Sequence, residues 1–202
     1  MKTFFCSLVL LLAQSSLALP GADALDAVKS KFSGGECSYF EFANIIESKI
    51  FGVIDTIYGS AYIARDGRYK IEIGSDVFLY DGLLLYTYFF ETNQVIIEQP
   101  DSGKLVSDEI SFVIKLDEWY DSKANSKNSY ALKKKEGIEG DIPDSLELIT
   151  NNEDSTIAEI RYFDINEDIN RVKFLKQKTD SSCSARRFEP DFPNSVEKVK
   201  LY

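Results

Sequence analysis

Apolar and polar residues alternate in short runs through most of the chain, which is the pattern of half-buried β-strands. The alternation is clearest at 69–73 (YKIEI), where three apolar residues alternate with Lys70 and Glu72. The dipeptides Asp66-Gly67 and Asp81-Gly82 interrupt the apolar runs and are strong hairpin signals. The pattern therefore predicts consecutive antiparallel strands joined by tight turns.

Two neighbouring runs break this alternation, because 77–80 (VFLY) and 83–90 (LLLYTYFF) are almost continuously apolar. They belong to a block, 59–98, that carries more aromatic and aliphatic side chains than a pair of half-buried strands needs. An unbroken apolar strand is expected where both faces of a sheet are covered, or where one face meets a ligand. The sequence leaves both explanations open.

The remaining strand predictions are less regular. Residues 38–51 are predicted as a strand pair or as one long bent strand, and 121–129 as a polar surface loop. The tail at 187–199 contains two prolines and is predicted as an edge strand followed by irregular chain. Further strands are predicted at 130–135, 146–150, 156–163 and 171–177.

Two segments have the apolar spacing of a helix. The first is 24–32, which ends at Gly34-Gly35. The second is 107–116, where Ser107 can cap the first turn and three apolar residues share one face: Ile110, Val113 and Ile114. The residues thus predict a mainly β, α+β domain, in which two short helices cover one strongly curved antiparallel sheet.

The first residues have the features of a secretory signal peptide. Lys2 precedes the apolar run 3–13, and Ser16-Leu17-Ala18 is a small-residue cleavage pattern. Cleavage is expected after Ala18, with a second site after Ala24, which leaves 19–202 as one domain. The alternative is a membrane anchor, but the run is shorter than the ~20 residues of a spanning helix. Since Cys6 does not follow a small-residue boundary, no lipid-modified cysteine is expected, and the mature protein should be soluble.

The charge of the chain limits its partners. The formal net charge is −10, and the basic run Lys133-Lys134-Lys135 is isolated, as expected of a solvated strand end or turn. Nucleic acids need a basic face, and anionic membranes recruit clustered lysines and arginines. We therefore expect no nucleic-acid partner, no stable direct membrane binding, and a freely diffusing monomer.

Two cysteines, Cys37 and Cys183, remain after the signal. In an exported protein such a pair can form a disulfide, which would close a long loop and stabilise the fold by roughly 4–5 kcal/mol in the chain-entropy model. Two unpaired thiols are the alternative.

Catalytic and metal-binding motifs are missing from the sequence. The chain has no histidine, which excludes Ser-His-Asp triads, Cys-His pairs and histidine metal sites. The segment 164–168 (DINED) resembles the start of a calcium loop, but Ile169 replaces the required glycine and Leu175 the required glutamate. We therefore expect a polar hairpin turn there, no metal or other cofactor, and no enzymatic activity. A hydrolase built on a pair of carboxylates is the remaining alternative.

Arg65 lies among apolar strand residues just before the first Asp-Gly turn. If it points inward, its donors need acceptors, which the free carbonyls at the end of a covering helix could supply. Arg65 would then be a latch between the sheet and a movable lid. The alternative is an ordinary solvent-exposed arginine beside a turn.

Three segments resemble the periplasmic outer-membrane lipoprotein carrier family, LolA. The first is 59–65 (GSAYIAR) with 68–71 (RYKI), which is similar to the family's glycine, aromatic strand, basic residue, turn and returning strand. The second contains Asp81-Gly82 and 93–95 (NQV), and the third is the tail 188–196 with its Phe-Pro pair. Asp66 replaces the family's usual proline but keeps a strong turn former.

The resemblance implies an unclosed antiparallel half-barrel with a helical lid over an apolar concave face. It implies a carrier that takes triacylated lipoproteins from an inner-membrane ABC-type releasing complex to an outer-membrane acceptor. Arg65 would be the lid latch, and Ile110, Val113 and Ile114 the lid face. The walls of the lipid cavity would be Tyr62, Ile63, Tyr69, Ile71, Ile73, Phe78, Tyr80, Leu84, Tyr86 and Ile97. An exported hydrophobic-ligand sensor or binding module of the same fold is the alternative function.

Overall fold

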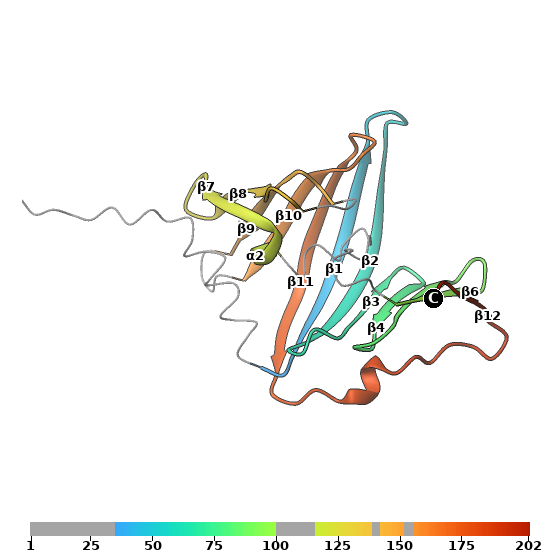
Figure 1. Ribbon diagram of the computed structural model, residues 1–202. Helices are drawn as coiled ribbons and strands as arrows, with labels where there is room; N and C mark the ends of the chain where they lie inside the picture. Colours follow the sequence, from blue (N-terminus) through green and yellow to red (C-terminus); the bar gives the residue numbers. More distant parts are fainter. Residues whose placement is uncertain (1–34, 100–115, 139–141, 152–155) are drawn as a thin grey trace, which may run out of the picture.

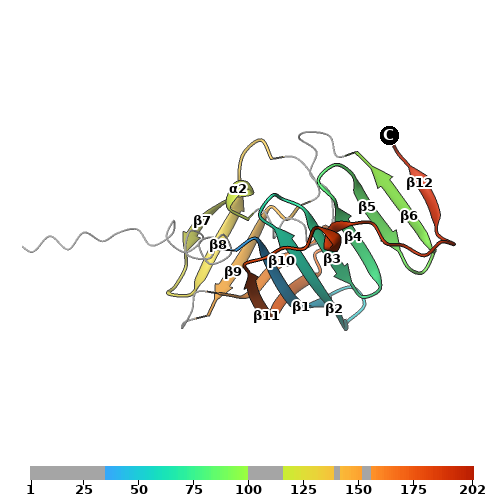
Figure 2. The same cartoon turned by 90° about the horizontal axis from the view of Figure 1, so that it is seen from below.

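The computed structural model describes residues 35–99, 116–138, 142–151 and 156–202. In these ranges the chain forms one curved sheet, shown in Figures 1 and 2. The strands are β1 (Cys37–Ser48), β2 (Val53–Ala64), β3 (Tyr69–Ile73), β4 (Asp76–Tyr80), β5 (Leu85–Phe89), β6 (Gln94–Glu98), β7 (Tyr120–Ala124), β8 (Ser129–Lys134), β9 (Ser145–Thr150), β10 (Ile157–Phe163), β11 (Ile169–Asp180) and β12 (Glu197–Lys200).

The strand order across the sheet is β12-β6-β5-β4-β3-β2-β1-β11-β10-β9-β8-β7. Most neighbours are consecutive in the sequence, as expected of hairpins, and β1 closes the gap by pairing with β11. β1 is one long strand whose register shifts between Glu41 and Phe42, so the long-bent-strand prediction for this region is the correct one. The three longest strands, β1, β2 and β11, form the middle of the sheet (Figure 1).

The two Asp-Gly turns form as predicted, and their geometry explains why. Gly67 and Gly82 have φ values of 91° and 101°, which glycine adopts without steric cost. Asp81 Oδ1 accepts hydrogen bonds from the backbone N–H groups of Leu83 and Leu84, each at 2.8 Å. The aspartate side chain thus stabilises the turn that its glycine permits.

The DINED segment is the polar hairpin turn that the sequence predicts. Asp164 Oδ1 accepts hydrogen bonds from the backbone N–H groups of Asn166, at 2.8 Å, and Asp168, at 3.0 Å. Glu167 adopts a φ of 61°. These bonds orient the aspartate toward its own backbone, as in other Asx turns.

Two predictions for the less regular segments are wrong. Residues 121–124, predicted as part of the loop 121–129, belong to the edge strand β7, and only 125–128 make the turn to β8. An edge strand needs side-chain contacts on one face only, so Ser122 and Ala124 suffice beside buried Tyr120. In the tail, the irregular chain comes first and the edge strand, β12, comes last.

β12 also departs from the antiparallel prediction, because it pairs with β6 in parallel. The tail crosses the sheet before it reaches the edge, and it arrives in the same direction as β6 (Figure 2). Helical structure in the described residues consists of α2 (Leu116–Trp119) and the 3-10 helix η2 (Ala185–Phe188). The predicted helix at 24–32 and almost all of 107–116 lie outside the described residues, as does the predicted signal peptide.

Candidate functional site

The sheet has two faces, and successive side chains of each strand point to opposite ones. We call the face that carries Phe40, Ile71 and Ile160 the inner face; α2 packs against it. The outer face carries Leu79 and Val95, and chain segment 183–196 packs against it.

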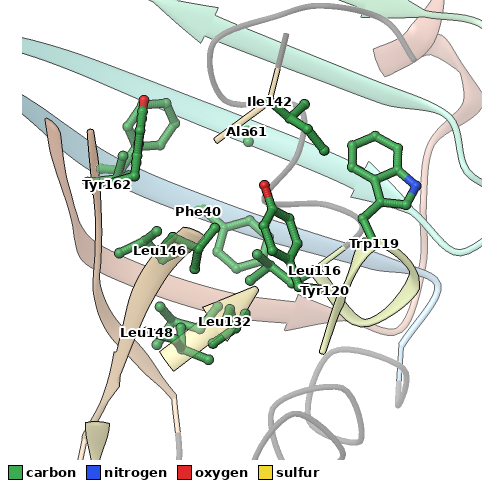
Figure 3. Close-up of a cluster of buried hydrophobic side chains, with 14 of the residues drawn as sticks. Phe40, Ala61, Leu116, Trp119, Tyr120, Leu132, Ile142, Leu146, Leu148 and Tyr162 are labelled. Carbon is green, nitrogen blue, oxygen red and sulfur yellow. The ribbon is translucent and has the colours of Figure 1, made fainter. Parts of the chain in front are cut away.

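The inner face carries the main hydrophobic cluster. On β8 to β11 its side chains are almost inaccessible to solvent, and Ile160 is 0% exposed. Leu116 and Trp119 of α2, together with Ile142, cover this part of the face (Figure 3). The buried members of the cluster are Phe40, Phe42, Ala61, Tyr69, Ile71, Leu85, Leu116, Trp119, Tyr120, Tyr130, Leu132, Ile142, Leu146, Leu148, Ile157, Ile160, Tyr162 and Val172.

Gly59, the first residue of the GSAYIAR segment, makes close packing possible at the middle of this face. It pairs with Phe42 across β1 and β2, and a Cβ atom at position 59 would overlap the Phe42 ring. The missing side chain lets the phenylalanine ring lie across β2 at 2% exposure.

Six of the ten predicted cavity-wall residues lie together on the inner face. The register places Tyr69 opposite both Ile63 and Tyr80, and it places Ile71 opposite Phe78. Tyr69 and Ile71 are buried, whereas the other four pack against the cluster while only partly buried. The six are Ile63, Tyr69, Ile71, Ile73, Phe78 and Tyr80.

The other four predicted wall residues, Tyr62, Leu84, Tyr86 and Ile97, lie on the outer face. A single cavity wall made of all ten is therefore wrong. Tyr62 and Ile63 are consecutive in β2, so they cannot share a face. On β5, Leu85 and not Tyr86 stands opposite Tyr80. The unbroken apolar run of β5 contains no charged residue that could reveal this parity, and a shift of one residue exchanges the faces.

Arg65 does not point into the sheet interior. Its side chain is 68% exposed, and its guanidinium lies 3.9 Å from the Glu36 carboxylate. Its backbone N–H donates to the Glu36 carbonyl at 3.0 Å. The inward orientation is thus wrong, and the solvent-exposed alternative is the observed one. The lid residues Ile110, Val113 and Ile114 lie outside the described residues, so the latch role of Arg65 stays a prediction.

Sequence reasoning missed the aromatic residues that cover the inner face. Trp119, the single tryptophan of the chain, and Tyr120 lie three and four residues beyond the segment predicted as a helix. The Tyr120 hydroxyl donates a hydrogen bond to the Pro143 carbonyl at 2.8 Å. Burial raises the pKa of this hydroxyl far above its usual value. A cluster of bulky aromatics at the end of a helical segment was the available signal.

Buried asparagines on the described part of the inner face form hydrogen bonds with one another and with the turn at Asp164. Asn44 Nδ2 donates to Asn170 Oδ1 at 3.5 Å, and Asn170 Nδ2 donates to Asp164 Oδ2 at 3.2 Å. Among the described residues there is no group of three or more His, Cys, Asp or Glu side chains placed to hold a metal ion. None of the helices in the described part of the chain has the length and apolar character needed to cross a membrane.

The outer face of β4 to β6 is covered by the C-terminal segment. Cys183 forms a disulfide with Cys37, and the two Cα atoms lie 5.3 Å apart. From there the chain packs Phe188 and Val196 into the outer cluster, and β12 continues as the sheet edge. The disulfide at one end and strand pairing at the other thus hold the segment across the outer face (Figure 2).

A pocket of about 520 Å³ lies where this segment meets the sheet edge. The apolar walls come from β5, β6 and Phe192, and the rim contains charged side chains from β12. Tyr86, one of the walls, donates its hydroxyl to Asp81 Oδ2 at 3.1 Å. Three misassigned wall residues thus line a pocket after all, on the opposite face. The lining residues are Leu84, Tyr86, Val95, Ile97, Pro190, Asp191, Phe192, Asn194, Lys198, Lys200 and Tyr202.

Solved structures with this arrangement exist, although no family model and no curated protein matches the chain. An uncharacterized conserved protein from Thermus thermophilus has a TM-score of 0.51 at 12% identity, and the match covers 89% of this chain and 98% of that one. At this identity the likeness shows a shared fold and nothing more.

Two further similar structures carry family names. A LolA superfamily protein from Nitrosomonas europaea matches with a TM-score of 0.48 at 7% identity, covering 84% of this chain and 97% of that one. A DUF1329 family protein from Desulfovibrio piger matches with a TM-score of 0.49 at 14% identity, covering 85% and 98%.

Proposed function

We propose that the protein is a carrier that binds acyl chains against the inner face of β2 to β4. The observation that carries this proposal is that four apolar residues of this face are only partly buried. Ile63, Ile73, Phe78 and Tyr80 pack at the rim of the main cluster but keep part of their surface exposed. They adjoin the fully packed half of the inner face, so an acyl chain would extend an existing apolar surface.

The energetics suit a carrier. Burial of an acyl chain contributes about 0.8 kcal/mol for each CH₂ group removed from water. A chain that lies on a partly exposed face is desolvated on one side, so it is held more weakly than in a closed core. Such intermediate affinity permits both uptake and release.

The cargo in this proposal is triacylated lipoproteins in the periplasm, received from an ABC-type releasing complex and passed to an outer-membrane acceptor. The LolA-like motifs of the sequence support this assignment. The disulfide between Cys37 and Cys183 supports an oxidising, exported location. Replacement of Arg65 by leucine tests the latch, since unchanged uptake and release of cargo would exclude that role.

A binding assay with a fluorescent tripalmitoylated lipopeptide tests the inner face. Phe78→Asp places a carboxylate among the half-buried residues of β4 and is expected to weaken lipopeptide binding by at least about tenfold, which is about 1.4 kcal/mol. The matched control is Phe90→Asp, since Phe90 lies in a turn and is exposed. Thermal unfolding of both variants shows whether each is folded. Equal affinities of the folded variants would contradict the proposal.

Native mass spectrometry of protein purified from its host separates the carrier from a binding module of the same fold. Copurified triacylated lipoprotein supports the carrier. A protein that carries only small hydrophobic molecules would instead support the sensor or binding module.

A further inference from the structure

The outer-face pocket has the size of a ligand site. Its volume of about 520 Å³ falls within the roughly 300–1,000 Å³ typical of small-molecule sites. Leu84, Tyr86, Val95, Ile97 and Phe192 supply the apolar walls, which come from three separate parts of the chain. Such sites combine apolar walls with a small number of polar groups that orient the ligand.

The orienting groups here are two lysines on the edge strand. Lys198 and Lys200 are alternate residues of β12, so they project to the same face, and their partners in the register are Val95 and Ile97. Both ammonium groups therefore stand beside the apolar wall. Among the residues that the structure describes, neither has an ion-pair partner, and Lys200 contacts the Tyr202 ring at 5.7 Å.

The other polar groups of the pocket offset only part of this positive charge. Among the described residues that line it, Asp191 is the single carboxylate side chain. The Tyr86 hydroxyl is already bonded to Asp81, so Tyr86 presents its ring to the pocket. Lys198 and Lys200 are exposed on the edge strand, where lysines are common, and they place positive charge beside an apolar wall in a chain with a net charge of −10.

We propose that this pocket binds a single-chain amphiphile with an anionic head group, such as a long-chain fatty acid. The alkyl chain lies along Leu84 and Phe192, the apolar walls that are only partly buried, and the anion contacts Lys198 and Lys200. The site is separate from the acyl-binding inner face, because the two lie on opposite faces of the sheet. The head-group charge distinguishes its ligand from an uncharged apolar chain.

Titration with 11-(dansylamino)undecanoic acid and with its methyl ester tests this proposal. Reversal of both charges, Lys198→Glu with Lys200→Glu, is expected to weaken binding of the acid by at least about tenfold and to leave binding of the ester unchanged. The matched control is Lys123→Glu with Lys133→Glu, which makes the same charge change at the opposite edge of the sheet. It is expected to retain the affinity of the wild type for the acid.

Leu84→Trp, which fills the pocket, is expected to abolish binding of both probes. Competition by palmitate or by a lysophosphatidic acid then shows whether the preferred anion is a carboxylate or a phosphate. The proposal is overturned if the charge reversal has no effect, if the control pair has the same effect, or if neither anion competes. It also fails if Phe78→Asp alone removes probe binding, because the probe would then occupy the inner face. That result leaves the proposed carrier function intact.

Discussion

Strands β8 to β10 and strands β4 to β6 occupy opposite halves of one sheet, yet they bury their side chains differently. In β8 to β10 the inner face is packed, while the outer face carries exposed residues such as Lys133 and Arg161. In β4 to β6 the outer face is the more buried one, with Val95 at 0% exposure, and the inner face is only partly buried apart from Leu85.

The cause of this difference is the C-terminal segment. It covers the outer face of β4 to β6 and no described part of β8 to β10, as Figure 2 shows. The apolar surplus of block 59–98 thus has a structural explanation, because those strands need apolar residues on two faces. The C-terminal segment leaves two surfaces that a ligand could contact, namely the half-buried inner face and the pocket at the sheet edge.

The largest expected effect comes from releasing this cover. Cys37→Ser with Cys183→Ser removes a link between residues 146 positions apart. The chain-entropy model predicts that the free energy of unfolding falls by about 4–5 kcal/mol. Guanidinium unfolding of the variant and the oxidised wild type measures this change. Limited proteolysis should then cut within 184–196 first, and protection of that segment would mean that packing alone holds the cover.

The next largest effect is expected from a charge placed on the outer face, which should destabilise β4 to β6 more than β8 to β10. Leu79→Asp on β4 places a carboxylate at a position with 1% exposure and should lower the free energy of unfolding by about 3–5 kcal/mol. Ile149→Asp, on the uncovered outer face of β9, should cost less than about 1 kcal/mol. Urea denaturation of both variants measures the difference, and equal losses would refute the one-sided cover.

Two conservative substitutions on the inner face should give a smaller difference, and here the larger loss of stability is expected in β8 to β10. Ile160→Val removes a methyl group from a fully buried site on β10 and should cost about 1 kcal/mol. Ile96→Val removes the same group from a half-buried site on β6 and should cost less than half as much. Chemical denaturation, analysed with one common denaturant dependence for both variants, measures the two losses in the free energy of unfolding. A larger loss at Ile96 would mean that the inner face of β6 is the better packed.

The last prediction is confined to alkaline pH. Burial, followed by the hydrogen bond to Asp81, raises the pKa of Tyr86 to about 12 from its usual value near 10. The folded state therefore retains this proton where the unfolded state loses it, so the contribution is complete below pH 10 and is lost as pH rises toward 12. Melting temperatures of wild type and Tyr86→Phe between pH 9 and 12 should show a shallower decline in the variant. Tyr58→Phe, at an exposed position, is the control and should follow the wild type.

Local signals predicted the parts of the fold that local physics controls. The YKIEI strand was readable because Lys70 and Glu72 mark its outer face, and the Asp-Gly turns because glycine alone adopts their φ values freely. The edge strand β7 was not readable, since five mostly polar or small residues form a strand only when β8 is available to pair with them.

Local signals also explain why only part of the candidate site was predicted. The six wall residues on β2 to β4 do share one face. This could be predicted because the polar residues of β3 show which of its side chains point to the other face. Tyr86 was assigned to the wrong face because β5 has no charged residue that indicates its parity. Ile97 was also assigned to the wrong face, although Gln94 and Glu98 mark the inner face of β6. Arg65 was open to two interpretations, since its position next to a turn allows either orientation until the neighbouring chain is placed.

By itself, the sequence determined most of the strands, the Asp-Gly turns, the acidic charge and the absence of histidine chemistry. Tertiary structure alone decided which face each strand buries, that β12 pairs in parallel, and that a lysine-rimmed pocket forms beside it. Alternation defines only which residues share a face. What covers that face comes from segments such as 183–196, about a hundred residues further along the chain, and is settled only when the chain folds back.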